Sequence, residues 1–221
     1  MTQWLILFAL IGIAASFAST LAIWAWGRFA HRAQGVPSFA LPVKEDQTEL
    51  DRRIAPLTSA RPGESGLALL RSNTDAFAAR ALAARRAGRS LDLMYYIWND
   101  DITGRLLLAE LLAAARRGVR IRLLLDDIGV SAHDDMLLAL NDQPGIEVRL
   151  FNPTRVRKGD LRRGIEMAFR FASVNRRMHN KAWIADSRLA IVGGRNIGDA
   201  YFDAAESTNF CDLDLIAFGA V

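Results

Sequence analysis

The N-terminal segment most constrains the fold, because no residue from Trp4 to Trp26 carries a charged side chain. At about 1.5 Å per residue, a helix of this length is roughly 34 Å long, enough to cross a hydrocarbon core of about 30 Å. Trp4, Trp24 and Trp26 lie near the two ends of the segment, where membrane helices carry aromatic belts. The segment therefore predicts one transmembrane helix.

A cleaved signal peptide is the competing interpretation of this segment. The start, Met1 to Gln3, lacks the basic residues that open a signal peptide, and the apolar run is long. Arg28 and Arg32 follow the run, whereas only the terminal amine precedes it. The positive-inside rule then predicts a single-pass membrane protein with its body in the cytoplasm.

The rest of the 221-residue chain is long enough for one core and alternates between predicted helices and strands. Residues 33–62 are rich in proline, serine and charge, which predicts a linker with one short helix. The alternation after it predicts an α/β layer sandwich. Strands are predicted at 66–70, 91–98, 119–125 and 146–151, with a last one from Phe210, and helices at 73–87, 103–117 and 132–141.

A histidine and a lysine lie two positions apart in the run RMHNKAWIADSRLAIVGGRN. On a strand alternate side chains share a face, so His179 and Lys181 should point into the same space. An imidazole is a competent nucleophile near pH 7, and an ammonium suits a phosphodiester oxygen. Asp186 and Ser187 then predict a turn, and residues 189–192 a second buried strand.

Two glycines and an amide complete this run. Gly193 and Gly194 allow the backbone to approach a ligand closely, and Asn196 adds an amide donor at the expected start of a helix. A lone histidine beside an apolar strand is more often a satisfied core residue. The complete spaced set favours a functional site instead.

The spaced set resembles the signature of the phospholipase D superfamily, His-x-Lys-x4-Asp-x6-Gly-Gly-x-Asn. The flanking runs LMYYIWNDDITG, RRGVRIRLLLDDIG and GGRNIGDAYFD resemble its cardiolipin-synthase-like bacterial branch. The resemblance implies a layered α/β/α sandwich of the phospholipase D type, preceded by one N-terminal transmembrane helix. The expected parts are a membrane anchor at 1–32, a linker at 33–62 and a half-domain with one motif at 63–221.

The resemblance also implies an enzyme that works through a phosphohistidine, with no metal and no cofactor. His179 would be the nucleophile or the acid, and Lys181, Gly194 and Asn196 would bind phosphate. Asp186 is placed in the catalytic set, although in the family this residue is more structural than chemical. A downstream acid normally orients the histidine; Asp212 is the candidate, with Asp214 second.

Substrate and location follow from the same resemblance. It implies an anionic phospholipid such as phosphatidylglycerol, a phosphatidyltransferase or hydrolase reaction, and the inner membrane of a bacterium. The acceptor alcohol and the choice between transfer and hydrolysis stay open. Alternatives are a dimeric single-motif endonuclease or phosphodiesterase acting on nucleic acid, and a half-domain that binds anionic lipid without turnover.

The chain carries one copy of a motif that lipid-acting relatives normally carry twice. His31 and His133 are the other histidines, and neither is followed two positions later by lysine. We expect the N-terminal half of a longer protein, and the alternative is a half-unit that completes its site by forming a homodimer.

Basic residues gather before the motif, where residues 153–178 hold eight basic side chains against two acidic ones, a surplus of six. The functional interpretation is a collar for anionic headgroups, interleaved with Phe169, Phe171 and Met178 as in an interfacial segment. A solvated basic surface, or binding of nucleic acid, would use the same charge. The expected membrane anchor favours lipid.

Other polar residues have simpler expected roles. Asp126 and Asp127 follow a strand, where hydrogen bonding is a better account than metal binding. Asp100 and Asp101 are expected to begin a helix before Thr103. Cys211 is the only cysteine, which excludes an intrachain disulfide and predicts a small core residue.

Overall fold

The computed structural model describes residues 2–32, 35–43, 47–157 and 159–219. It divides the chain into two compact units, which differ from the predicted parts because residues 152–177 group with the N-terminal helix. Residues 33–34 and 44–46 of the predicted linker lie outside the described residues. Unit 1 comprises Met1–Ser38 and Asn152–Arg177, and unit 2 comprises Phe39–Phe151 and Met178–Val221.

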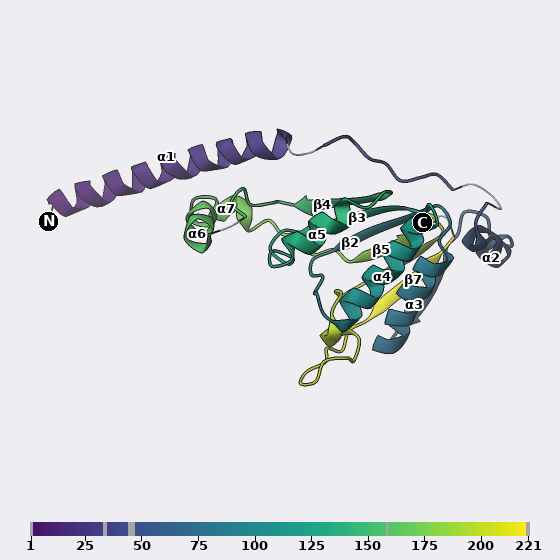
Figure 1. The fold of residues 1–221 in the computed structure, drawn as a ribbon. Coiled ribbons are helices and arrows are strands. Elements are labelled where there is room, and N and C mark those ends of the chain that lie inside the picture. The colour runs from purple at the N-terminus through teal and green to yellow at the C-terminus, as the bar shows by residue number, and fades with distance from the viewer. Residues whose placement is uncertain (1, 33–34, 44–46, 158, 220–221) are drawn as a thin grey trace. The chain divides into compact units, whose positions relative to one another are not determined.

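The described residues of unit 2 form a seven-stranded mixed sheet with strand order β1-β7-β6-β5-β2-β3-β4 (Figure 1). Strands β2, β3 and β4 run parallel, and every other neighbouring pair is antiparallel. The strands are β1 (Gly66–Leu70), β2 (Ser90–Tyr95), β3 (Arg120–Asp126), β4 (Ile146–Phe151), β5 (Ala182–Ala185), β6 (Leu189–Gly193) and β7 (Asp214–Phe218).

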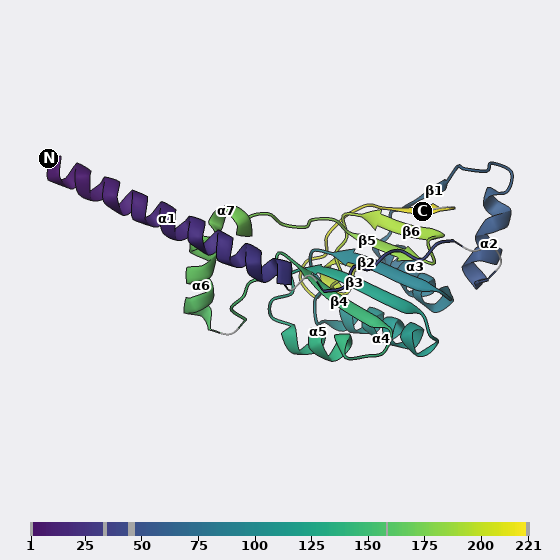
Figure 2. The same cartoon turned by 90° about the horizontal axis from the view of Figure 1, so that it is seen from above.

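Helices α3 (Asn73–Arg86), α4 (Ile102–Arg116) and α5 (Asp134–Asn141) lie along one face of this sheet (Figures 1 and 2). The strands alternate accordingly. On β2, Leu91, Leu93 and Tyr95 are buried in the core, whereas the intervening side chains are only part-buried. This period of two is what one helix-covered face imposes on a strand.

Short polar side chains determine where the helices begin. Ser72 accepts a hydrogen bond from the backbone N–H of Asp75 at 3.2 Å and so caps α3. Asp101 caps α4 by accepting from Gly104 N–H at 2.9 Å, which confirms its expected role as a helix-start acid. Thr48 and Asp51 form a reciprocal capping box at the start of α2 (Glu49–Thr58), the short helix expected in the linker.

Unit 1 contains α1 (Thr2–Arg32), α6 (Asp160–Phe169) and α7 (Phe171–Val174). Over an 18-residue window α1 has a mean hydropathy of 2.3, and none of that window is buried. Its length and composition make α1 a candidate membrane span, although a signal sequence would share them. No helix is predicted from the sequence for residues 160–174, so α6 and α7 are additions.

Several predicted boundaries near the motif are wrong. Strand β2 ends at Tyr95, because Trp98 pairs with Ile197 in an isolated parallel bridge instead. Strand β5 begins only at Ala182, and Asn196 lies in a loop, not at a helix start. The segment that carries His179 and Lys181 therefore leads into the strand and is not part of it.

Candidate active site

The sheet topology gathers several strand ends at one edge of unit 2. Because β2 and β5 are antiparallel, β2 ends near Tyr95 where β5 begins at Ala182. For the same reason β6 ends at Gly193 where β7 begins at Asp214. Candidate residues that flank these strand ends therefore share one edge of the sheet.

His179 and Lys181 are in direct contact at this edge. Nζ of Lys181 lies 3.2 Å from Nδ1 of His179 and donates to the His179 carbonyl at 2.8 Å. The histidine is exposed, whereas the lysine is only 7 % exposed. A charged ammonium has donors only, so Nδ1 is the acceptor in this pair when Lys181 is protonated.

A carboxylate at the end of β3 fixes the backbone just before His179. One oxygen of Asp126 accepts from the N–H of Met178 at 2.9 Å, and the other accepts from Ile128 N–H at 3.1 Å. Asp126 and Asp127 are fully buried. Asp126 therefore has the hydrogen-bonding role that the sequence predicts for it. Met178 is buried in unit 2, so it is not part of an interfacial segment.

Tyr96 is a member of the site that the sequence patterns miss, since they identify it only as a strand former. Its ring centroid lies 4.9 Å from that of His179, and Nζ of Lys181 lies 5.8 Å from the same ring. The available signal was its position at the C-terminal end of a strand, where functional side chains of α/β sheets gather.

Burial lowers the pKa of Lys181 below its ordinary value, because desolvation penalises the ammonium. The nearby charge of Asp212 opposes this and raises the pKa in part. The Asp212 carboxylate accepts from Leu213 N–H at 2.7 Å, and among the described residues it has no hydrogen bond with His179. Asp212 is therefore coupled here to the lysine, and its orienting role stays a proposal.

The amide of Asn196 is held on both sides. Oδ1 accepts from Ile97 N–H at 3.1 Å, Nδ2 donates to the Tyr201 hydroxyl at 2.9 Å, and the residue is buried. An amide group has two N–H donors, and among the described residues one of them has a partner, so the other can serve a ligand oxygen. Ile97 follows Tyr96, and this dipeptide therefore links the amide to the histidine.

Gly193 and Gly194 are required by packing within the protein, besides any approach of a ligand. A methyl group on Gly193 would collide with the Asp214 carboxylate, and one on Gly194 would collide with that of Asp212. The segment that leads into β7 therefore passes directly over the glycine pair.

Asp214, the second candidate for orienting the histidine, belongs to a buried ion pair, so that expectation is wrong. Arg80 donates to its carboxylate at 2.9 Å, and Arg195 lies 3.4 Å from it, with all three side chains fully buried. Arg195 also donates to Asn73 at 2.8 Å and to the carbonyl of Arg71 at 2.9 Å. This network anchors the loop between Gly194 and Asn196.

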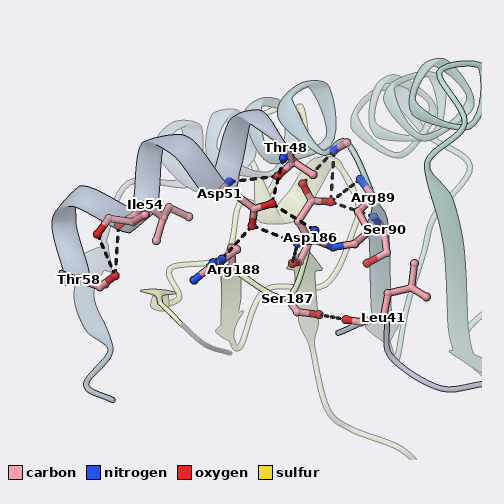
Figure 3. Close-up of polar contacts among 12 residues, drawn as sticks. Leu41, Thr48, Asp51, Ile54, Thr58, Arg89, Ser90, Asp186, Ser187 and Arg188 are labelled. Atoms are coloured by element: carbon pink, nitrogen blue, oxygen red, sulfur yellow. Dashed lines mark hydrogen bonds and ion pairs between the residues drawn. The ribbon is translucent and has the colours of Figure 1, made fainter. Parts of the chain in front are cut away.

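Asp186 lies at the opposite end of the sheet from His179. Its carboxylate accepts hydrogen bonds from the backbone N–H groups of Gly88, Arg89 and Ser90 at 2.9, 2.7 and 2.9 Å (Figure 3). Six residues, including all four of β5, lie between His179 and Asp186, a span of roughly 20 Å along an extended chain. The site at the β2–β5 edge therefore does not include this aspartate.

A second carboxylate, Asp51 of α2, supports the same turn (Figure 3). It accepts from Arg89 at 3.1 Å and from Arg188 at 2.9 Å. Burial raises the pKa of Asp51, but hydrogen bonds from Arg89, Arg188 and Thr48 N–H outweigh this and lower it to about 2. Asp186 and Ser187 have positive φ angles of 54° and 55°, which confirms the turn predicted there.

Two other expectations concern ligands and thiols. Among the described residues no group of three or more His, Cys, Asp or Glu side chains is placed to hold a metal ion. Cys211 is exposed, so its expected place in the core is wrong. Its segment precedes β7, which begins only at Asp214.

Residues 83–214 match the family described as cardiolipin synthase, phospholipase D-like domain. Among curated proteins, the chain is 52 % identical over 168 residues to cardiolipin synthase C of Escherichia coli K12. The match covers 76 % of this chain and 35 % of that protein. The chain therefore spans about a third of the length of this relative.

Two solved structures share the fold. NucT from Helicobacter pylori matches with a TM-score of 0.53 and 16 % identity, covering 71 % of this chain and 87 % of that one. Phosphatidylserine synthase of Haemophilus influenzae matches with a TM-score of 0.50 and 15 % identity, covering 70 % and 33 %. Both confirm the α/β fold class expected from the sequence.

Proposed function

Since the chain belongs to the phospholipase D-like domain family of cardiolipin synthases, we propose that it supplies one half of a membrane-bound phosphatidyltransferase site. The donor is an anionic phospholipid such as phosphatidylglycerol, and the bacterial inner membrane holds the chain through α1. The His179–Lys181 contact at the β2–β5 edge carries this proposal.

The proposed first step forms a bond between a histidine nitrogen and the phosphorus and breaks the phosphorus–oxygen bond to the headgroup alcohol. That alcohol leaves with a proton from a second histidine. Lys181 neutralises part of the charge on the phosphate oxygens, and the remaining N–H of Asn196 donates a hydrogen bond to them. In the second step an acceptor hydroxyl gives its proton to the second histidine and attacks the phosphorus, which breaks the phosphorus–nitrogen bond and releases the first histidine. An alcohol as acceptor gives transfer, and water gives hydrolysis.

The hydrogen bonding of His179 bears on which role it takes. While Nδ1 accepts from Lys181, a neutral ring carries its proton on Nε2, so Nε2 has no lone pair with which to attack the phosphorus. Arrival of a phosphate would draw Nζ of Lys181 away, so that the ring proton can move from Nε2 to Nδ1 through solvent. We propose that Asp212 then accepts from Nδ1, which leaves Nε2 as the nucleophile.

The second histidine and lysine come, in this proposal, from a further segment of a longer protein. A second copy of this chain is the alternative. The extent of the relative supports the first arrangement, because this chain covers only 35 % of it.

The test uses the chain alone in vesicles and, separately, a chimera in which it replaces the matched region of the Escherichia coli relative. Both are incubated with tail-labelled phosphatidylglycerol and a chelator, and His179→Ala is the matched control. We expect an acid-labile lipid adduct on His179 and labelled cardiolipin from the chimera. The His179→Ala variant should lose both the adduct and the product. A chimera that forms product equally well with His179→Ala would contradict the catalytic role.

DNA serves as the competing substrate in the same assays. Cleavage of DNA by the chain without conversion of lipid would replace the proposal with the nuclease alternative. A chimera that binds phosphatidylglycerol vesicles but converts neither substrate would favour the alternative of a half-domain that binds anionic lipid without turnover.

A further inference from the structure

Helix α6 carries an apolar stripe that the structure leaves exposed. Leu161, Ile165 and Phe169 recur every four residues and so lie on one side of the helix, and Phe171 follows in α7. These side chains are between 40 % and 79 % exposed. Arg162 and Glu166 lie on another side of the helix. An amphipathic helix of this kind needs a partner for its apolar side.

Within unit 1 this helix is packed against α1. The hydroxyl of Ser19 donates to the carbonyl of Phe169 at 2.6 Å, and the indole N–H of Trp26 donates to the carbonyl of Pro153 at 2.8 Å. The guanidinium of Arg155 lies 5.5 Å from the ring of Phe29. The contacts run from residue 19 to residue 29 of α1, about 15 Å along its axis.

Among the residues that the structure describes here, the buried charge of Arg170 is satisfied internally. Arg170 is 1 % exposed, and its guanidinium lies 4.1 Å from the ring of Trp26. It donates to Glu166 at 2.6 Å and to Asn152 at 3.0 Å. Asn152 donates in turn to the carbonyl of Ser173 at 2.8 Å. Arg170 therefore fixes α6 and α7 to α1 and leaves the apolar stripe facing outward.

The position of this contact along α1 indicates what covers the stripe. Arg28 lies 5.0 Å from the ring of Trp24, a pairing typical of the membrane–water boundary. Ser19 is nine residues closer to the N-terminus, or about 13 Å deeper along the helix. If Arg28 marks the boundary, the end of α6 that bonds to Ser19 lies at the level of the lipid tails.

We propose that the surface formed by Leu161, Ile165, Phe169 and Phe171, here the α6 apolar stripe, inserts into the leaflet where α1 emerges. This inference rests on the proposed membrane anchoring. The occupant is a bilayer that contains anionic phospholipid, because the six surplus positive charges of residues 153–178 lie on the same short segment. The insertion would hold unit 1 to the headgroup layer from which the substrate is drawn.

Depth-dependent quenching of single labels tests this in the full chain. Cys211→Ser removes the native thiol, and an environment-sensitive fluorophore is attached to a cysteine placed at Leu161. Labels at Phe17 of α1 and at Leu138 of α5 are the controls, because both side chains are well exposed and lie in different units. The chain is reconstituted in vesicles of phosphatidylcholine and phosphatidylglycerol that carry nitroxide-labelled lipid tails.

We expect the Leu161 label to be quenched at least half as strongly as the Phe17 label, and the Leu138 label to be unaffected. Replacing phosphatidylglycerol by phosphatidylcholine should reduce the quenching at Leu161 at least twofold and leave Phe17 unchanged. Quenching at Leu161 no greater than at Leu138, or an unquenched Phe17, would overturn the proposal. Equal quenching without phosphatidylglycerol would overturn its dependence on anionic lipid.

This measurement reads depth and needs no turnover. Failure of insertion is therefore distinguishable from failure of the proposed transferase activity.

Discussion

The carboxylate of Asp186 accepts a hydrogen bond from the backbone N–H of Arg89 at 2.7 Å, at the end of the sheet opposite the His179 imidazole. The residues of the motif therefore lie at two ends of the sheet and have different roles. Its histidine and lysine meet at one edge of the sheet, and its aspartate fixes the turn between β5 and β6 to the start of β2. The spacing between the histidine and the aspartate matches the length of β5, which lies between them.

Asp186→Asn should destabilise unit 2 without changing the chemistry. The amide keeps one acceptor oxygen but turns an N–H₂ group toward backbone donors, so we expect a loss of about 2 to 4 kcal/mol in the free energy of unfolding. Urea unfolding in detergent measures it. Asp100→Asn, at an exposed ion pair with Arg105, is the control and should change little. Adduct formation per folded molecule should be unchanged; a selective loss of it would give Asp186 a chemical role.

Asp51 should make stability depend on pH in the acid range. Its pKa in the folded chain is about 2, below the ordinary 3.8, so it stabilises the fold above pH 4 and loses that effect as the pH falls toward 2. With allowance for solvent screening, the contribution is about 1 to 2 kcal/mol. Unfolding midpoints measured from pH 6 to pH 2 should converge for the wild type and Asp51→Asn. Parallel curves would contradict the assignment.

The sequence patterns predict the strands and helices of unit 2 well because hydrophobic period and turn residues are local properties. Strands 66–70 and 146–151 have the predicted bounds, and the turn at Asp186 has the predicted conformation. The end of β2 could not be predicted, since the bridge between Trp98 and Ile197 joins residues far apart in sequence.

The environment of the site was equally beyond local patterns. Arg80 and Arg195 are fully buried, which their residue type does not indicate, and only the assembled sheet brings both to Asp214. The amphipathic period of Leu161, Ile165 and Phe169 is present in the sequence, but this arginine-rich segment is interpreted from the sequence as a basic collar, and no helix is predicted there.

Arg80→Met should be strongly destabilising, because it leaves the Asp214 carboxylate buried with only Arg195 nearby. Removing one partner of a buried ion pair costs about 3 to 5 kcal/mol. Arg85→Met on the same helix is the matched control, since its ion pair with Glu110 is partly exposed. Thermal unfolding of the two variants compares them. A similar shift in both would mean that the buried pair contributes little.

Tyr96→Leu should slow formation of the histidine adduct in the chimera by about three- to tenfold, because the aromatic ring orients the imidazole 4.9 Å away. Tyr96→Phe keeps the ring and should retain the wild-type rate. Rapid-quench measurement of the adduct separates this step from product release. An equal loss in Tyr96→Phe would assign the effect to the hydroxyl group and not to the ring.

Lys181 should titrate below the ordinary lysine value, and Asp212→Asn should lower its pKa further. Burial disfavours the ammonium and the Asp212 charge favours it, so removing that charge leaves desolvation less opposed. The chain has three lysines, and reductive methylation with ¹³C-formaldehyde gives each a resolved signal that Lys181→Arg assigns. Glu206→Gln is the control, because Glu206 is an exposed acid that lies, like Asp212, between β6 and β7.

The same titration has a consequence for folding. A lowered pKa means that the folded chain binds fewer protons than the unfolded chain, so the cost of holding Lys181 charged is present at neutral pH. That cost is relieved as the pH rises from the folded to the unfolded pKa.

The titration of Lys181 should also limit phosphate binding at high pH. In Asp212→Asn this limit should move to lower pH, in step with the titration midpoint of the ¹³C-methylated Lys181 signal measured by NMR. A midpoint that rises in this variant would exclude Asp212 as the charge that supports Lys181.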